Sequence, residues 1–121
     1  MKSVTSSAEI AVLSKAFIRA GEGLGLNDTD LSAVLGEQVF TVLHLRHGHE
    51  LLELSTDARS RAMLLVELYL SLLALAGTEQ NAKIWISSDN RGLSGRPRDL
   101  IACQKGLEQV VQYLAATRSL I

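Results

Sequence analysis

The sequence contains little of several residue types that mark particular classes of protein. Its single cysteine, Cys103, excludes an intramolecular disulfide and favours a reducing compartment. The N-terminus has no basic stretch followed by an apolar run, so the sequence predicts no secretion signal. The longest apolar stretch, residues 63–76, contains Glu67 and Ser71 and is too short and too polar to span a bilayer. These absences predict a cytoplasmic protein with no membrane partner.

Aromatic residues and net charge are also scarce, and both limit what the chain can do. Only 4% of the 121 residues are aromatic, so Leu, Ala, Val and Ile must supply the core of a chain that is 47% hydrophobic. A formal net charge of −1 gives no sign of a polyanionic partner. Residues 1–60 hold eight acidic and five basic side chains, whereas residues 61–121 hold five and seven. The N-terminal half is therefore acidic and the C-terminal half mildly basic.

Apolar residues recur at spacings of three and four along almost the whole chain, which is typical of amphipathic helices. No strand-length alternation of β-branched and polar residues is present. We predict an all-α fold of seven helices: 8–20, 30–35, 38–47, 57–76 capped by Thr56 or Asp57, a short helix carrying Trp85, one beginning at Pro97, and 107–117. Glycines are expected to end or separate these helices, at Gly21 to Gly25, Gly36, Gly48, Gly77 and Gly106. Residues 1–55 would form a helix-turn-helix-like bundle that continues into a C-terminal helical domain, residues 56–121.

Residues 26–48 have the frame of a helix-turn-helix, because a short helix ends at Gly36 and a second follows a tight turn. In DNA-binding proteins the start of the second helix enters the major groove. The candidate DNA contacts are Gln38, Thr41 and Arg46. Few cations accompany them, and Lys and Arg contacts to phosphate dominate DNA affinity. A simple three-helix packing unit is the alternative interpretation.

The predicted second helix carries apolar residues at positions where the recognition helix of a DNA-binding protein carries polar residues. They are Val39, Phe40 and Leu43. Apolar exposure on this scale usually marks an interface. We therefore predict that these three residues are dimer contacts.

A polar loop, SSDNRGLSGR, lies between Trp85 and Pro97. Asp89 and Asn90 can stabilise a turn through their own backbone, and Gly92 and Gly95 allow positive φ. An exposed Leu93 close to Trp85 and flanked by Arg91 and Arg96 would form an interface anchor with a polar rim. The alternative is that Trp85 and Leu93 cover the core beneath the loop.

The pattern A-x-x-W-I-x-x-x-N-x-x-L-x-G-x-P-x-D-L-I-x-x-x-x-G-L, residues 82–107, resembles the toxin-binding domain of the Xre/MbcA/ParS antitoxin family. The upstream helix-turn-helix frame is similar to the Xre-like N-terminal part of that family. This resemblance implies an antitoxin that neutralises a RES-type toxin acting on NAD or ADP-ribose. It also implies a homodimer that binds the promoter of its own operon.

The resemblance also assigns candidate toxin-binding positions. The motif positions are Trp85, Asn90, Leu93, Gly95 and Pro97, and the surrounding loop adds Arg91, Gly92 and Arg96. We expect the motif positions mainly to shape the domain and the two arginines to contact toxin. Arg96 departs from the family pattern, where a capping Thr is frequent, because a guanidinium cannot accept an N-cap hydrogen bond. The C-terminal Leu120 and Ile121 would either enter a toxin's active-site cleft or pack on the domain.

No residue group indicates catalysis, a cofactor or a metal. His44, His47 and His49 fit no zinc-ligand spacing and are better explained as a solvated helix end. Cys103 is predicted to be a small core residue on a helix. Because no convergent polar site can be named, the sequence predicts a protein that is not an enzyme. The alternatives to an antitoxin are a helix-turn-helix DNA-binding regulator and a stand-alone homodimeric adaptor.

Overall fold

A computed structural model describes residues 7–48 and 55–120 of the chain, and these residues form seven α-helices and one short 3-10 helix. The elements are α1 (Ser7–Leu24), α2 (Asp28–Leu35), α3 (Val39–Arg46), α4 (Thr56–Ala76), α5 (Glu79–Ser87), η2 (Arg91–Leu93), α6 (Pro97–Leu100) and α7 (Gln104–Arg118). The predicted all-α fold is confirmed. Among these residues no single helix is long and apolar enough to cross a membrane, although α4 and α5, bent by 111°, meet that test as a pair.

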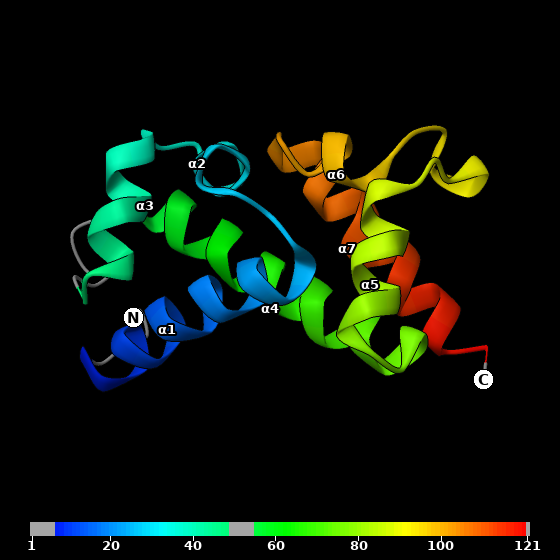
Figure 1. Cartoon of the computed structure of the whole chain (residues 1–121), viewed down its shortest axis with the longest axis horizontal. Coiled ribbons are helices and arrows are strands. Elements are labelled where there is room, and N and C mark those ends of the chain that lie inside the picture. Colours follow the sequence, from blue (N-terminus) through cyan, green and yellow to red (C-terminus); the bar gives the residue numbers. More distant parts are fainter. Residues whose placement is uncertain (1–6, 49–54, 121) are drawn as a thin grey trace, which may run out of the picture.

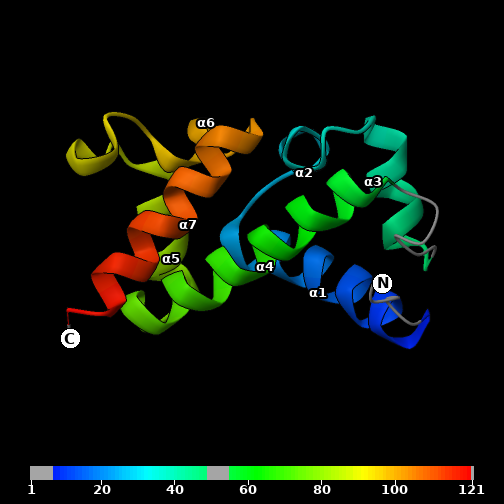
Figure 2. The same cartoon turned by 180° about the vertical axis from the view of Figure 1, so that it is seen from behind.

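The long helix α4 is the central element of the molecule. Figures 1 and 2 show it running diagonally from the group formed by α1–α3 to the group formed by α5–α7, and it packs against both α1 and α7. Its apolar residues face both groups, which explains why residues 63–76 are apolar on most faces. Ser55, not Thr56 or Asp57, is its N-cap, since the Ser55 hydroxyl accepts a hydrogen bond from the Ala58 N–H at 3.1 Å.

Helix α1 continues past the position at which the glycines were predicted to end it. Gly21 and Gly23 lie inside the helix and are buried. A Cβ atom at Gly21 would lie 2.8 Å from the Leu31 side chain, and one at Gly23 would lie 2.5 Å from the Tyr69 ring. These glycines therefore permit close packing of α2 and α4 on α1, and the prediction that the helix ends at residue 20 is wrong. Only Gly25, with φ 74°, follows the helix in a left-handed conformation.

The two groups of helices share one continuous core and are also joined by polar contacts. On one side, Glu79 of α5 accepts hydrogen bonds from Tyr69 of α4 and Arg19 of α1, each at 2.5 Å. On the other, Arg98 of α6 pairs with Asp30 of α2 at 2.5 Å. Buried residues of both groups belong to the same hydrophobic cluster. The division into residues 1–55 and 56–121 remains a prediction, and in space the two parts are packed together.

Candidate functional site

The loop that follows α5 is a closed turn held by Asn90 and Gly95. The Asn90 N–H donates to the Gly95 carbonyl at 2.8 Å, and the Gly95 N–H donates back to the Asn90 carbonyl at 3.2 Å. Inside this pair, the Asn90 side chain accepts a hydrogen bond from the Leu93 N–H at 3.0 Å and so caps η2. The structure therefore confirms that Asn90 stabilises the turn. Asn90 and Gly95, both motif positions, are the two ends of the loop.

The two glycines of the loop do not adopt the positive φ that the sequence analysis expects of them. Neither Gly92 nor Gly95 has a positive φ, whereas Ser94, with φ 59°, does. A Cβ atom at Gly92 would lie 2.9 Å from the Tyr113 ring, so Gly92 allows the loop to sit directly on α7. At Gly95 the nearest atoms belong to Leu100 at 3.7 Å, which is an ordinary contact.

Leu93 is buried, with 3% of its surface exposed. The prediction of an exposed Leu93 anchor is therefore wrong, and the alternative of a core residue beneath the loop is correct. Its side chain is turned inward because the Asn90 cap closes the loop over it. Trp85 is half-buried and stacks on Tyr113, with ring centroids 6.4 Å apart and planes inclined by 25°.

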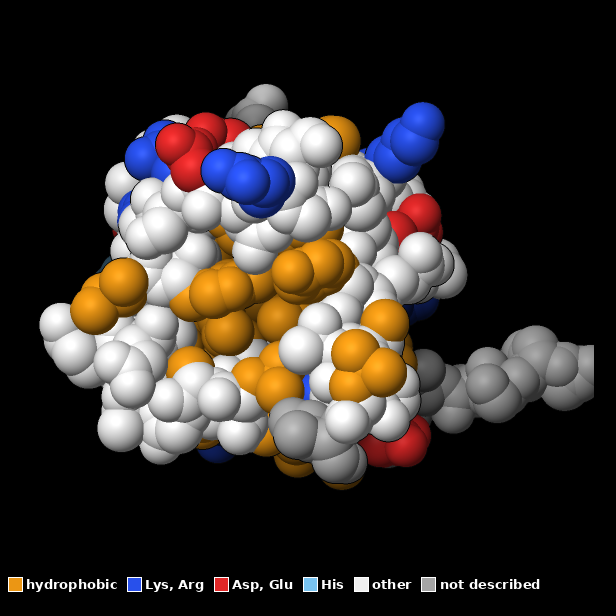
Figure 3. All heavy atoms as spheres, turned by 90° about the vertical axis from the view of Figure 1, so that its right-hand side faces the viewer, with side chains coloured by type: hydrophobic (Ala, Val, Ile, Leu, Met, Phe, Trp, Pro, Cys, Tyr) orange, Lys and Arg blue, Asp and Glu red, His pale blue; other side chains and the backbone are white. Residues whose placement is uncertain are grey.

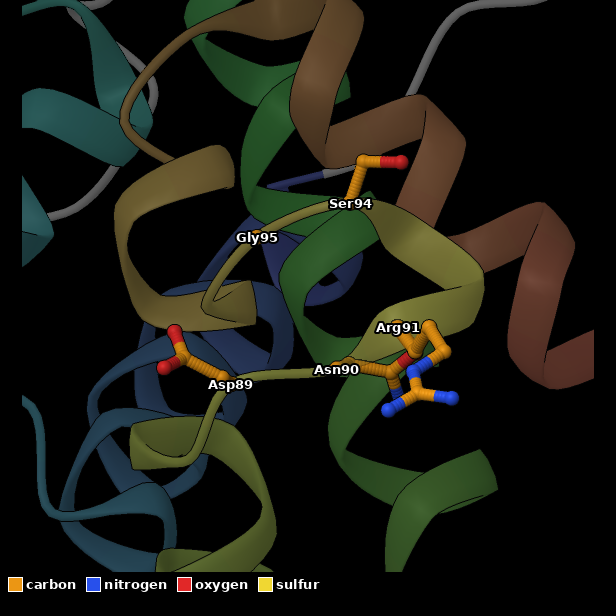
Figure 4. A pocket seen from close by; sticks show the side chains of 5 residues that line it. All are labelled: Asp89, Asn90, Arg91, Ser94 and Gly95. Carbon is orange, nitrogen blue, oxygen red and sulfur yellow. The ribbon is translucent and has the colours of Figure 1, made fainter.

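The arginines of this region have different surroundings. Arg96 forms two hydrogen bonds to the Asp99 carboxylate at 2.9 and 3.1 Å, three residues into α6. This hydrogen-bonded guanidinium holds the pKa of the Asp99 carboxyl below its ordinary value. Arg96 thus joins the start of the helix to Asp99 by an ion pair, in place of the side-chain cap that it cannot provide. Arg91 is exposed and extends away from the loop (Figure 4).

The remaining motif positions shape the backbone around α6 and α7. Pro97 is buried at the first position of α6, as predicted. Gly106 does not separate two helices but lies inside α7, where a Cβ atom would come within 1.9 Å of the Leu100 carbonyl oxygen. Helix α7 therefore begins at Gln104, three residues earlier than predicted. Cys103 is its exposed N-cap residue, so the prediction of a core cysteine is wrong.

An open hollow of about 570 Å³ lies at the loop and is lined by Asp89, Asn90, Arg91, Ser94 and Gly95. Figure 4 shows that the side chains of Asp89 and Arg91 point away from each other and do not converge on one point.

Within the described part of the chain, no group of three His, Cys, Asp or Glu residues could hold a metal ion. His49 lies outside the described residues, as does Ile121, while Leu120 is exposed.

A second hollow, which we call the apolar groove, lies between α4, α5 and α7. Its volume is about 300 Å³, and it is lined by Leu72, Leu75, Ala76, Trp85, Tyr113, Leu114 and Thr117. Figure 3 shows hydrophobic side chains gathered in a hollow on this end of the molecule. Of these residues the sequence singled out Trp85 alone. The sequence signal for the groove is the run of apolar residues at the end of residues 63–76. Helices α5 and α7 cannot cover all of these side chains, so some of them line an open surface.

Helices α2 and α3 are joined by a turn at Gly36, whose φ of 72° ends α2 as predicted. Among the candidate DNA contacts, Gln38 is exposed and Thr41 is half-buried. The Arg46 guanidinium lies 2.7 Å from the Asp28 carboxylate and 3.5 Å from that of Glu22. Its charge is therefore already balanced within the molecule.

Helix α3 presents apolar side chains to solvent on the side away from its buried Val42 and Leu45. Val39, Phe40 and Leu43 are 39%, 54% and 40% exposed. Phe40 is the most exposed of the three, and its ring contacts His44 edge-on, with centroids 5.5 Å apart. The three residues predicted as dimer contacts thus lie at the surface together, although their role remains a prediction.

The described residues thus form a helical fold with a loop hollow and an apolar groove in its C-terminal part. A comparison with family models identifies that part: residues 71–119 match the antitoxin Xre/MbcA/ParS C-terminal toxin-binding domain. No curated protein matches the chain. The matched segment runs from the second half of α4 through α7 and includes every motif position from Trp85 to Pro97. This match confirms the resemblance of residues 82–107 to that toxin-binding domain. The match supports an antitoxin role with a toxin as partner, and it suggests a regulatory protein without catalysis.

Proposed function

We propose that this protein is the antitoxin of a type II toxin–antitoxin pair and that it neutralises a RES-type toxin acting on NAD or ADP-ribose. The observation that carries the proposal is the family match over residues 71–119. The type of toxin comes from the family resemblance of the motif between Trp85 and Gly106. We infer that neutralisation occurs by binding alone, through a surface that covers the toxin's catalytic centre.

The closed loop between Asn90 and Gly95 is the proposed contact region. Its backbone is fixed by the hydrogen bonds between its two ends, so little conformational entropy is lost when a partner binds. Arg91 extends outward from this fixed loop, whereas Arg96 is engaged with Asp99. We therefore assign the larger part of the electrostatic contact to Arg91 and expect Arg96 mainly to maintain the start of α6.

We further propose that the protein forms a homodimer through α3. The supporting observation is the exposed apolar surface of Val39, Phe40 and Leu43. The same surface favours the second candidate function, a homodimeric adaptor that has no toxin partner. A DNA-binding regulator is supported less, since Arg46 is already paired with two carboxylates and Gln38 is uncharged. Autoregulation of the promoter would therefore need DNA contacts that the homodimer supplies and a single chain lacks.

Co-expression tests the proposal most simply. We expect the product of the adjacent gene to co-purify with the tagged chain at fixed stoichiometry and to arrest growth when expressed alone. A homodimer without a partner, together with an adjacent gene product that does not affect growth, would contradict the antitoxin assignment and favour the adaptor. A mobility shift with the gene's upstream DNA, abolished by Gln38→Ala, would instead indicate a DNA-binding regulator.

A further inference from the structure

We propose that the apolar groove, with Arg91 beside it, is where the toxin docks an apolar segment that carries a carboxylate. This inference rests on the proposed antitoxin function and names the chemistry of the partner that the site accepts. It adds to the loop a second contact surface, made by α4, α5 and α7, to which Trp85 is the one motif residue that contributes.

The groove has the composition of an anchoring pocket in a protein interface. Leu72 and Leu114 form a buried floor, each 2% exposed. The half-buried Trp85 and Tyr113 stack side by side in its wall, and such aromatic pairs often carry much of the energy at interfaces. Its volume of about 300 Å³ lies at the lower limit for pockets that hold small molecules, about 300–1,000 Å³. The groove therefore suits a few apolar side chains of a protein partner.

Arg91 supplies the charged side of the site. Arg91 lines the loop hollow, and a Cβ atom at the next residue, Gly92, would lie 2.9 Å from Tyr113 of the groove wall, so the loop hollow and the groove are neighbours in the fold. Among residues 7–48 and 55–120, no carboxylate lies within ion-pair distance of Arg91, whereas Arg96 and Arg98 both have carboxylate partners. An exposed guanidinium beside an apolar surface is complementary to a segment that places a carboxylate next to apolar residues.

The position of the groove within the chain indicates that the toxin occupies it. Every residue that lines it falls within residues 71–119, the segment that matches the toxin-binding domain. The surface proposed for self-association lies on α3, in the other group of helices (Figure 1). A second copy of this chain would therefore use a different face and leave the groove available to the toxin.

A pair of substitutions on one helix tests the groove. Leu75 lines it, whereas Leu70 lies on the exposed side of α4 and is 57% exposed. The probe is the purified product of the adjacent gene, and its Kd is measured against both variants. We expect Leu75→Gln to weaken binding at least about tenfold and Leu70→Gln to change it by less than about twofold. Equal binding by the two variants would overturn the inference.

Arg91 is tested in the same assay. We expect Arg91→Gln to weaken binding at least about fivefold at low salt and by less at high salt, because ionic screening reduces an exposed charge contact. Lys105→Gln, on the exposed surface of α7, is the matched control and should leave the Kd unchanged. A loss of affinity that is the same for both variants would show a general charge effect and contradict a specific carboxylate contact.

A spectroscopic measurement on the wild-type sequence avoids the folding risk of a residue substitution. Trp85 is the only tryptophan, so 5-fluorotryptophan incorporated into this chain gives one fluorine signal from the groove. We expect that signal to shift when the toxin is added. An unchanged signal in a complex that has formed would overturn the groove inference. A shift that depends on this chain's concentration without toxin would show a second copy in the groove and overturn it too.

These outcomes distinguish a failure of the groove inference from a failure of the proposed function. If the wild-type chain binds no toxin, the proposed function fails and the groove inference fails with it. If the wild-type chain binds the toxin but Leu75→Gln binds equally well, the antitoxin assignment stands and the groove inference alone is wrong.

Discussion

Arg98 of α6 donates a hydrogen bond to the Asp30 carboxylate of α2 at 2.5 Å, which joins the toxin-binding segment to the N-terminal helices. The same carboxylate oxygen accepts from the Asn27 N–H at 2.9 Å within the capping box of α2. Arg98 also donates to the Gly25 carbonyl at 3.1 Å. One side chain thus holds the start of α2 against α6, and the predicted regions 1–55 and 56–121 meet at a specific polar contact.

We predict that Arg98→Met lowers the free energy of unfolding by about 1.5–3 kcal/mol, the usual range for hydrogen bonds to charged groups. Methionine keeps most of the aliphatic length, so the loss reflects the polar contacts. Arg96→Met is the control, because the ion pair between Arg96 and Asp99 lies within one exposed helix turn and should contribute little to stability. Urea unfolding of the two variants measures the difference, and equal stability would show that the Arg98–Asp30 contact contributes nothing.

The loop glycines give a second test. We predict that Gly92→Ala costs about 1–3 kcal/mol, because its methyl group must displace the Tyr113 ring from its position against Trp85. Gly95→Ala should be tolerated within about 0.5 kcal/mol, since its Cβ atom would meet Leu100 at an ordinary contact distance of 3.7 Å and its φ is not positive. Thermal unfolding and Trp85 fluorescence report both effects. The opposite order of stability would indicate that Gly95 is the position that requires glycine.

A third prediction concerns acid stability. Tyr69 and then Arg19 hold the pKa of the Glu79 carboxyl below its ordinary value of 4.5, because both donate hydrogen bonds to the ionised form. A lowered pKa in the folded state means stabilisation that is present above the unfolded-state pKa and is lost as pH falls through the folded value. Between about pH 6 and about pH 3, wild type should therefore lose more of its Tm than Glu79→Gln does. Parallel pH profiles for the two proteins would contradict this role of Glu79.

The exposed face of α3 provides a fourth prediction. Phe40→Glu should convert a dimer into a monomer, because it places a charge within an apolar contact surface. Phe40 is 54% exposed in the single chain, so the substitution should leave the fold intact. Light scattering gives the mass, and circular dichroism confirms the helical content. A Phe40→Glu variant that remains dimeric would exclude α3 from the interface.

Local signals in the sequence were sufficient for most of the helices. Asn27, Thr78 and Pro97 occupy the helix starts that their chemistry predicts, and Gly36 and Gly77 follow the helix ends. Each of these residues acts within a few positions of itself, through a side-chain cap, a fixed φ or a left-handed conformation. Such short-range effects do not depend on which other helices are nearby.

The errors arose where a distant partner determined the role of a residue. Gly23 and Gly92 are glycines because tyrosine side chains from other helices pack against them, and Gly106 because the Leu100 carbonyl does. Leu93 is buried because the loop folds onto α7. The apolar groove was missed for the same reason, since its walls come from three helices separated along the chain.

The most direct test of the account is growth rescue by matched variants. The adjacent gene is expressed from an inducible promoter, and the wild-type chain, Arg91→Gln, Leu75→Gln or Leu70→Gln is expressed beside it. We predict growth arrest by the adjacent gene alone, full rescue by wild type and Leu70→Gln, and impaired rescue by Arg91→Gln and Leu75→Gln at equal protein levels. An adjacent gene product that arrests growth equally with and without the wild-type chain would contradict the antitoxin function itself.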